Sequence, residues 1–308
     1  MIHSFDNIND AQLYCLAEIM KQADFVLTRG YITKEIGPLS FSIQNPRKRL
    51  TTIKQRKWNF VAAVGELLWH LSGSKDLNTI ANYLSEWKNF SKDGFSIDNS
   101  CYGYKIFQKE DNGYSKWNKI IEILKKDPGS RRAVLSLYND KDGLNEFDID
   151  VSCTCTLQFM IRDNKLNLIV YMRSNDAIWG LPYDFFLFSF LQELLSKELG
   201  IDLGVYTHMC GSMHIYERHF SLAKKIIIDP KYDRNCSMPA MTSLESYNSF
   251  ISIEQFIKNN TFSISSILSL QQYWKDLASV LMYHYYKKNS VAIPSDLMSS
   301  LSPYFTLL

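Results

Sequence analysis

The chain has 308 residues, of which 46% are hydrophobic and 21% are charged, and its formal net charge at pH 7 is +2. This composition supports a large folded core and excludes a mostly disordered protein, and the near-neutral charge argues against a broad nucleic-acid-binding surface. No apolar run approaches a membrane span, residues 1–12 lack the features of a secretory leader, and six scattered cysteines without a CxxC pair indicate reduced thiols in a cytosol-like compartment.

The N-terminal part of the chain predicts a helix and a strand. Apolar residues recur with a helical period over residues 10–23, and apolar and polar residues alternate in a predicted strand over residues 39–43. Between these elements, Arg29 precedes Gly30 at a predicted turn, where the backbone can approach an anion closely. The basic cluster at residues 47–49 follows the strand and is interpreted as a solvated loop.

A carboxylate interrupts the next predicted element. Residues 60–71 are apolar on almost every side, which predicts a buried helix, and Glu66 lies inside it. Burying an unpaired carboxylate is costly, so we expect Glu66 to be paired, to have a raised pKa or to line a cavity, and we interpret it as a functional residue. Residues 78–103 are expected to form a helix followed by a loop, with core aromatic residues at Trp87, Phe90 and Phe95.

Two adjacent arginines open a later strand. A predicted helix over residues 115–126 is followed by a turn, and Arg131 and Arg132 then precede an apolar strand over residues 133–138. Neighbouring residues of a strand point to opposite faces. The two guanidinium groups could therefore hold one dianion only through unusual backbone geometry or with a second chain, and surface ion pairs are the alternative.

A long hairpin is predicted next. Residues 151–162 and 166–173 form its strands, and Asp163-Asn164 forms the turn. Cys153 lies in the first strand and would by itself be a small buried hydrophobe. A guanidinium beside it, such as that of Arg173 at the end of the second strand, would lower the pKa of the thiol and create a nucleophilic thiolate.

The hairpin is followed by a predicted apolar helix over residues 185–199, with Asp184 as its N-cap. Residues 263–289 are also expected to be helical, with aromatic side chains used for packing. Several potential metal ligands have spacings that match no zinc signature, so no metal site is predicted: His208, Cys210, His214 and His219.

Several motifs together resemble those of the thymidylate synthases and the related pyrimidine-nucleotide hydroxymethylases. They are Glu66-Leu-Leu-Trp69, Ser130-Arg131-Arg132, Cys153 followed by Gln158-Phe159, Arg173-Ser174-Asn175-Asp176, Gly180-Leu-Pro-Tyr183 and His214-Ile-Tyr216. The resemblance is close over residues 130–219, looser over 23–103, and fades after residue 229. It implies an α/β (α+β) fold in one catalytic domain spanning residues 1–308, divergent from about residue 230, with a mixed, twisted β-sheet covered by helices and one sheet face used for dimerisation.

The resemblance also implies roles for individual residues. Cys153 would add to C6 of a pyrimidine, so that C5 can attack the methylene group of the co-substrate 5,10-methylenetetrahydrofolate, and Glu66 would manage proton transfers with water. Asp176 and Trp87 would contact the folate. The other residues would bind the nucleotide: Arg29, Arg131, Arg132, Arg173 and Ser174 its phosphate, His214 and Tyr216 its 3′-hydroxyl, and Gln158 and Asp184 its base and sugar. In a homodimer, Arg131 and Arg132 would reach the partner's active site, and neither DNA nor a membrane is expected as a partner.

Asp184 stands where thymidylate synthases have asparagine. An asparagine can donate to O4 of uracil and accept from its N3–H, whereas a carboxylate accepts from the N4 amino group of cytosine and faces uracil O4 without a donor. Mismatched buried hydrogen bonds can reduce the use of the wrong substrate by up to ~10⁴. The same replacement is found in the deoxycytidylate hydroxymethylases that the chain resembles. The sequence therefore predicts a deoxycytidylate 5-hydroxymethyltransferase.

Other departures from the thymidylate synthase pattern favour hydroxymethylation over methylation. Thr154, Met172 and Ser212 replace a histidine, a glutamine and an aspartate, and residues 303–308 lack the C-terminal sequence whose closure excludes water. The alternatives are a CMP 5-hydroxymethylase of the nucleoside-antibiotic type, a divergent thymidylate synthase that methylates dUMP, and a catalytically silent nucleotide- or RNA-binding relative. The HxE and PCxxC motifs of zinc cytidine deaminases are absent from the sequence.

Overall fold

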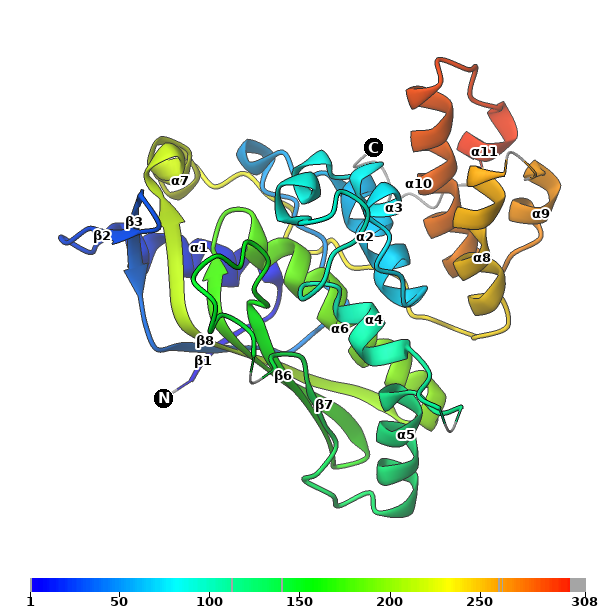
Figure 1. Ribbon diagram of the computed structural model, residues 1–308, viewed down its shortest axis with the longest axis horizontal. Coiled ribbons are helices and arrows are strands. Elements are labelled where there is room, and N and C mark those ends of the chain that lie inside the picture. The colour runs from blue at the N-terminus through cyan, green and yellow to red at the C-terminus, as the bar shows by residue number, and fades with distance from the viewer. Residues whose placement is uncertain (1, 112, 140, 260, 262, 300–308) are drawn as a thin grey trace. The chain divides into compact units, whose positions relative to one another are not determined.

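The computed structural model describes residues 2–111, 113–139, 141–259, 261 and 263–299 (Figure 1). The expectation about residues 303–308 lies outside these residues. The chain divides into two compact units, which we call the sheet unit (residues 1–58, 118–142 and 152–238) and the helical unit (59–117, 143–151 and 239–308). Within the described residues, no helix has the length and apolar character needed to span a membrane.

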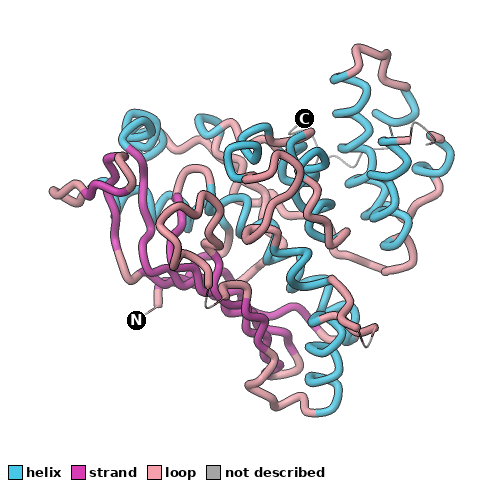
Figure 2. The backbone as a smooth tube through the Cα atoms, viewed as in Figure 1, coloured by secondary structure: helices cyan, strands magenta, loops and turns pink. Residues whose placement is uncertain are grey.

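The sheet unit contains an eight-stranded mixed sheet, whose strands appear together in magenta in Figure 2. Strands β1 and β4 pair in parallel, as do β7 and β8, and the other pairs are antiparallel. The order is β1(His3–Phe5), β4(Leu39–Ile43), β8(Asp202–Tyr216), β7(Lys165–Asp176), β6(Thr154–Arg162) and β5(Val134–Ser136), with β3(Tyr31–Ile36) also on β8 and β2(Val26–Thr28) on β3. This mixed sheet confirms the predicted fold class.

The predicted hairpin is formed by β6 and β7. Arg162 pairs with Lys165, and the two residues between them, Asp163 and Asn164, have φ values of +50° and +56°. A two-residue turn with positive φ at both residues matches the twist of two antiparallel strands, and Asn and Asp adopt positive φ more readily than most residues. Strand β7 continues beyond the predicted end at Arg173 to Asp176.

Helices cover one face of the sheet. Helix α6(Gly180–Leu199) packs on β7 and β8, and α1(Ile8–Met20) packs on β3, β4 and β8 (Figure 1). The residues of β7 that face these helices, such as Leu168 and Val170, are fully buried, whereas Tyr171 on the other face is exposed. The sheet unit is completed by η1(Lys54–Arg56), η3(Glu217–His219) and α7(Phe220–Ile228). Helix α5(Lys116–Lys126) precedes β5.

Two predictions for the sheet unit are wrong. Helix α6 begins at Gly180, so Asp184 lies inside the helix and is not its N-cap. The helix can start earlier because Pro182 falls in its first turn, where a proline costs no hydrogen bond. Arg49 is not in a solvated loop: it is fully buried, and its Nη2 lies 2.6 Å from Oε2 of Glu193 on α6.

The helical unit is built around α2(Phe60–Leu71), which has the predicted bounds. Around it pack α3(Leu77–Ala81), α4(Tyr102–Phe107), α8(Tyr247–Lys258) and α10(Gln272–Lys288), and the unit also contains η2(Ser85–Phe90), α9(Ile264–Leu268) and α11(Ser295–Ser299). Trp87 packs against a core cluster that includes Trp69, as predicted. The prediction that Phe90 and Phe95 are core residues is wrong, because their side chains are 45% and 73% exposed.

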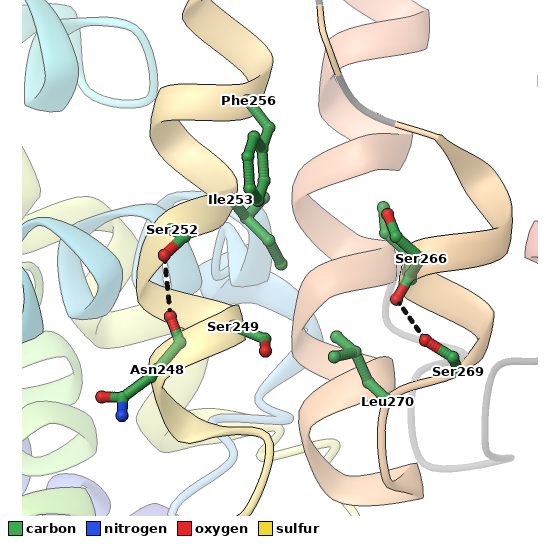
Figure 3. A pocket seen from close by; sticks show the side chains of 9 residues that line it. Asn248, Ser249, Ser252, Ile253, Phe256, Ser266, Ser269 and Leu270 are labelled. Atoms are coloured by element: carbon green, nitrogen blue, oxygen red, sulfur yellow. Dashed lines mark hydrogen bonds between the residues drawn. The ribbon is translucent and has the colours of Figure 1, made fainter.

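A pocket in the helical unit lies between α8 and α9 (Figure 3). Its lining includes four serines and the apolar side chains of Ile253 and Phe256, and none of the lining residues is charged. Ser252 donates to the carbonyl oxygen of Asn248 at 2.9 Å, and Ser269 donates to that of Ser266 at 2.8 Å. These hydroxyl groups are therefore satisfied within their own helical turns.

Candidate active site

The strand directions bring three motifs to one edge of the sheet. Because β6 is antiparallel to β7 while β7 and β8 are parallel, the start of β6 and the ends of β7 and β8 lie at the same edge. Cys153 immediately precedes β6, Arg173 lies near the end of β7, and His214 lies near the end of β8. We refer to this edge as the motif edge.

The thiol and the guanidinium at the motif edge are neighbours. Nη2 of Arg173 lies 3.8 Å from Sγ of Cys153. Nε of Arg173 donates to the carbonyl oxygen of Ser152 at 2.9 Å, and its backbone N–H donates to the carbonyl oxygen of Cys153 at 2.9 Å. These bonds hold the cation beside a half-buried thiol, which is the environment of a nucleophilic cysteine. By contrast, burial raises the pKa of the Cys155 thiol.

Polar side chains near the ends of β7 and β8 contact one another at the motif edge. Ser174 pairs with Ser212 across β7 and β8, and its Oγ lies 3.5 Å from Nδ1 of His214. The rings of His214 and Tyr216 are 5.1 Å apart and nearly perpendicular. Burial raises the pKa of the Tyr216 hydroxyl, and the positive charge of Arg29 acts in the opposite direction.

Arg29 occupies the turn between β2 and β3. Arg29 and Gly30 have φ values of +48° and +80°, so the turn uses the left-handed region that glycine adopts without strain. Strand β3 pairs with β8, and the rings of Tyr31 and Tyr216 are 5.8 Å apart. The structure therefore brings the Arg29 turn close to the end of β8, and the Arg29 side chain itself is exposed.

Asp184 projects from α6 to the last residues of β7. Nδ2 of Asn175 donates to Oδ2 of Asp184 at 2.7 Å. A Cβ atom at Gly180 would lie 2.9 Å from the same Nδ2, so glycine leaves room for this contact. Burial raises the pKa of Asp184 to about 7, the hydrogen bond from Asn175 opposes this shift, and the charge of Asp176 adds to it.

The two adjacent arginines lie at another part of the sheet unit. Arg131 and Arg132 are exposed and line a surface pocket together with Lys126 and Ser130. The amide of Gln158 donates to the carbonyl oxygen of Arg131 at 2.9 Å. Gln158 thus contacts the arginine segment, while its role toward base and sugar stays a prediction.

Two further predicted residues belong to the helical unit. Glu66 is half-exposed, although its neighbours from Ala62 to Gly65 and from Leu67 to Leu71 are buried. This exposure departs from the fully buried helix that the sequence predicts, and the functional role of Glu66 stays a prediction. The indole of Trp87 lies 5.2 Å from that of Trp69.

The structure adds two polar residues that the sequence reasoning missed. Asn175 contacts Asp184, and Glu35 on β3 accepts a hydrogen bond from Ser212 at 2.6 Å. Glu35 therefore brings a carboxylate to Ser212, which lies two residues before His214 and replaces an aspartate of the family pattern. Asn175 lies within the recognised motif but has no predicted role of its own, and Glu35 is distant in sequence, so neither residue carries a local signal.

A thiol held beside a guanidinium is the arrangement that a cysteine nucleophile requires. Residues 16–261 match the family described as Thymidylate synthase. The chain therefore belongs to the thymidylate synthase family.

Relatives and a solved structure agree with this assignment. The chain is 33% identical to the deoxyuridylate hydroxymethyltransferase of Bacillus phage SP01 over 227 residues. This match covers 70% of this chain and 59% of the phage protein. It is 30% identical to the enzyme of the same name from Pseudomonas phage M6, over 58% of this chain and 51% of that protein. It is 28% identical to the thymidylate synthase of Mycoplasma genitalium, over 60% of this chain and 72% of that protein. The match thus spans less than two thirds of each phage relative.

The fold is also that of a solved relative. The crystal structure of thymidylate synthase from T4 phage matches with a TM-score of 0.60 and 22% identity, covering 72% of this chain and 81% of that chain. This likeness confirms the predicted fold.

Proposed function

We propose that the chain is a deoxycytidylate 5-hydroxymethyltransferase. It would transfer a one-carbon unit from 5,10-methylenetetrahydrofolate to C5 of dCMP and add water, giving 5-hydroxymethyl-dCMP and tetrahydrofolate. The observation that carries the choice of base is the carboxyl group of Asp184 on α6, which accepts a hydrogen bond from Asn175 near the end of β7. Family membership and the names of the two phage relatives support one-carbon transfer with hydroxymethylation.

Cys153 begins the reaction in this proposal. C5 of a pyrimidine is a poor nucleophile, and addition of a thiolate to C6 gives C5 the character of an enamine carbon. Arg173, with Nη2 at 3.8 Å from Sγ, stabilises the thiolate that must form first. The bond between Nε and the Ser152 carbonyl oxygen keeps the guanidinium at this distance.

Nucleotide binding uses the side chains around Cys153. Arg29, Arg173 and Ser174 offer charge-assisted donors to a phosphate, and His214 and Tyr216 offer polar atoms to a 3′-hydroxyl. We assign Glu66 to proton transfers with water, because it is the half-exposed position in a run of buried residues. After one-carbon transfer, loss of the C5 proton and of tetrahydrofolate would leave an exocyclic methylene group on C5. Water would add to this methylene carbon, and elimination of the Cys153 thiolate from C6 would release the product.

The residues of the sheet unit fit the folate co-substrate, which supplies the one-carbon unit. Oδ1 of Asp176 accepts from the backbone N–H groups of Ile178 and Trp179 at 2.7 and 3.1 Å, so the carboxylate is held in one orientation. The indole of Trp179 is 43% exposed beside it. A fixed acceptor next to an exposed flat ring suits the N–H donors and the ring of a pterin. Trp87 would also contact the folate, as the family resemblance implies.

A homodimer is part of the proposal. The sheet face opposite α6 carries exposed apolar side chains. Tyr171 and Met209 are cross-strand partners, exposed by 42% and 41%, and Val134 lies on the same face with 42% exposure. An exposed apolar face of this kind marks an interaction surface. Gln158 lies on the same face and bonds to the Arg131 carbonyl oxygen, so a partner on this face would meet the arginine segment. We propose that Arg131 and Arg132 bind the phosphate in the partner's site.

Hydroxymethylation of dUMP is the second candidate, because both phage relatives are named for it. The raised pKa of Asp184, about 7, also supports it, since a protonated carboxyl group can donate to uracil O4. The decisive experiment incubates the protein with dCMP, dUMP or CMP labelled with tritium at C5, together with 5,10-methylenetetrahydrofolate. Release of tritium chiefly from dCMP and a product heavier by one CH₂O group are expected. A preference for dUMP would overturn the choice of base, a preference for CMP the choice of sugar, and a methyl product the hydroxymethyl assignment.

A further inference from the structure

The contact between Asn175 and Asp184 has a consequence for how the carboxyl group meets a base. Asn175 is almost fully buried, and its 2.7 Å bond to Oδ2 of Asp184 is the one hydrogen bond of its side chain within the described part of the chain. The two residues come from different elements, the end of β7 and the second turn of α6. Gly180 keeps the space around Nδ2 open.

A donor aimed at one carboxyl oxygen makes the two oxygens unequal. Oδ2 is the better acceptor for the Asn175 amide when it carries no proton, because a carboxylic hydroxyl oxygen is a weak acceptor. A proton on the Asp184 carboxyl group is therefore favoured on Oδ1. This matters at neutral pH because burial raises the pKa of Asp184 to about 7, so that the protonated form is well populated.

The order of donor and acceptor along the carboxyl group distinguishes cytosine from uracil. Cytosine presents an acceptor at N3 and a donor at position 4, and uracil presents the reverse. A protonated carboxyl group that exchanged its proton freely between its oxygens could match either base. Attack of Cys153 at C6 requires one orientation of the ring, so a carboxyl group with its proton fixed on one oxygen matches only one base.

We propose that Asn175 is a positioning residue that determines base specificity: by donating to Oδ2 of Asp184, it fixes the proton-bearing oxygen and thereby the donor–acceptor order that the base meets. The inference rests on the proposed nucleotide reaction but not on which base is preferred. If the enzyme prefers dCMP, Oδ2 accepts from the N4 amino group and the Oδ1 hydroxyl donates to N3.

The test compares the wild-type protein with Asn175→Ala and with the isosteric Asn175→Asp. The kcat/KM values for dCMP and dUMP are measured between pH 6 and pH 8, and Asp184 is titrated by carboxyl ¹³C NMR in the free protein. Loss of the amide donor is expected to bring the ratio of the two kcat/KM values about tenfold closer to one, which corresponds to the loss of one ordinary hydrogen bond. It is also expected to raise the pKa of Asp184, and Asn175→Asp is expected to raise the upper apparent pKa of the resulting carboxyl pair further.

A matched control is Asn167→Ala on the same strand. The Asn167 side chain accepts from the backbone N–H of Val205 at 2.8 Å and does not bond to Asp184. This variant is expected to lose stability without changing the ratio of dCMP to dUMP use. If the protein turns over neither nucleotide, the ratio of the two dissociation constants from calorimetry replaces the ratio of kcat/KM.

The outcomes separate the two proposals. A wild-type preference for dUMP that Asn175→Ala relaxes would support the role of Asn175 and reject the proposed dCMP activity. A wild-type preference for dCMP that both Asn175 variants leave intact would reject the role of Asn175 alone. An unchanged pKa of Asp184 in Asn175→Ala would also overturn the inference, whatever the substrate.

Discussion

Arg173 holds its Nη2 atom 3.8 Å from the Cys153 sulfur while two other nitrogen atoms of the same residue bond to the backbone at residues 152 and 153. These two bonds fix the position of the guanidinium group relative to the backbone of Cys153. This geometry makes the proposed thiolate sensitive to the shape of the side chain at position 173 as well as to its charge.

Arg173→Lys is expected to lower kcat by about 10² and to raise the pH at which Cys153 reacts with iodoacetamide. Lysine keeps the charge, but it lacks the planar fork that bonds to the Ser152 carbonyl oxygen and faces Sγ at the same time. The measurement is the pH dependence of alkylation followed by mass spectrometry, with Cys153→Ser as the control for the labelled site. An unchanged alkylation profile would show that Arg173 does not activate the thiol.

Asp184→Asn is expected to shift the preference from dCMP toward dUMP by at least about 10², because the amide offers a donor to O4 at every pH, whereas the carboxyl group offers one only when it is protonated. The competing nucleotides are presented together, and the products are separated by mass. Equal preference in the variant and the wild type would leave Asp184 without a role in base recognition.

The same substitution is expected to change the pH dependence of stability. The pKa of Asp184 in the folded protein, about 7, lies above its ordinary value of 3.8, so its contribution to stability is fully present below pH 3.8 and is lost as the pH rises through 7. Asp184→Asn should therefore stabilise the protein relative to wild type more at pH 8 than at pH 5. After allowance for solvent around the half-buried carboxyl group, the difference is on the order of 2 kcal/mol. Urea unfolding at the two pH values measures it, and a difference of the opposite sign would contradict the raised pKa.

Arg49→Met is expected to destabilise the sheet unit by about 3–5 kcal/mol, because it leaves the Glu193 carboxylate buried without the cation that lies 2.6 Å away. The double variant Arg49→Met with Glu193→Leu should recover most of this loss, since it removes both buried charges. Thermal unfolding of the two variants and the wild type provides the comparison. Equal losses in the single and double variants would mean that packing, not the uncompensated charge, sets the cost.

Mixing two inactive variants tests the shared active site. Arg132→Ala and Cys153→Ser should each be inactive alone, and a mixture of refolded subunits should regain about a quarter of wild-type activity, because half of the dimers are mixed and each has one complete site. Met209→Glu on the exposed sheet face should prevent the recovery by blocking dimerisation. No recovery in a mixture that forms dimers would place the arginines in the site of their own chain.

The sequence by itself determined the family-level architecture and the motif residues. The alternation in β7 and the Asp163-Asn164 turn depend on the side-chain period and on local backbone preferences, so the sequence predicts both. Helix α2 was also read with its correct bounds, because its apolar run is continuous and ends at polar residues. These features are local, so neighbouring residues carry the information.

Only the tertiary structure decided which side chains from separate elements are in contact. Arg49 and Glu193 are far apart in the sequence, and Asn175 and Asp184 belong to a strand and a helix. No local sequence pattern therefore indicates either contact. Because α6 begins at Gly180, Asp184 lies in the second turn of the helix and not at the predicted N-cap, and burial at this position raises its pKa. A side chain's protonation and partners depend on the surrounding volume and charge, which exist only after the chain has folded.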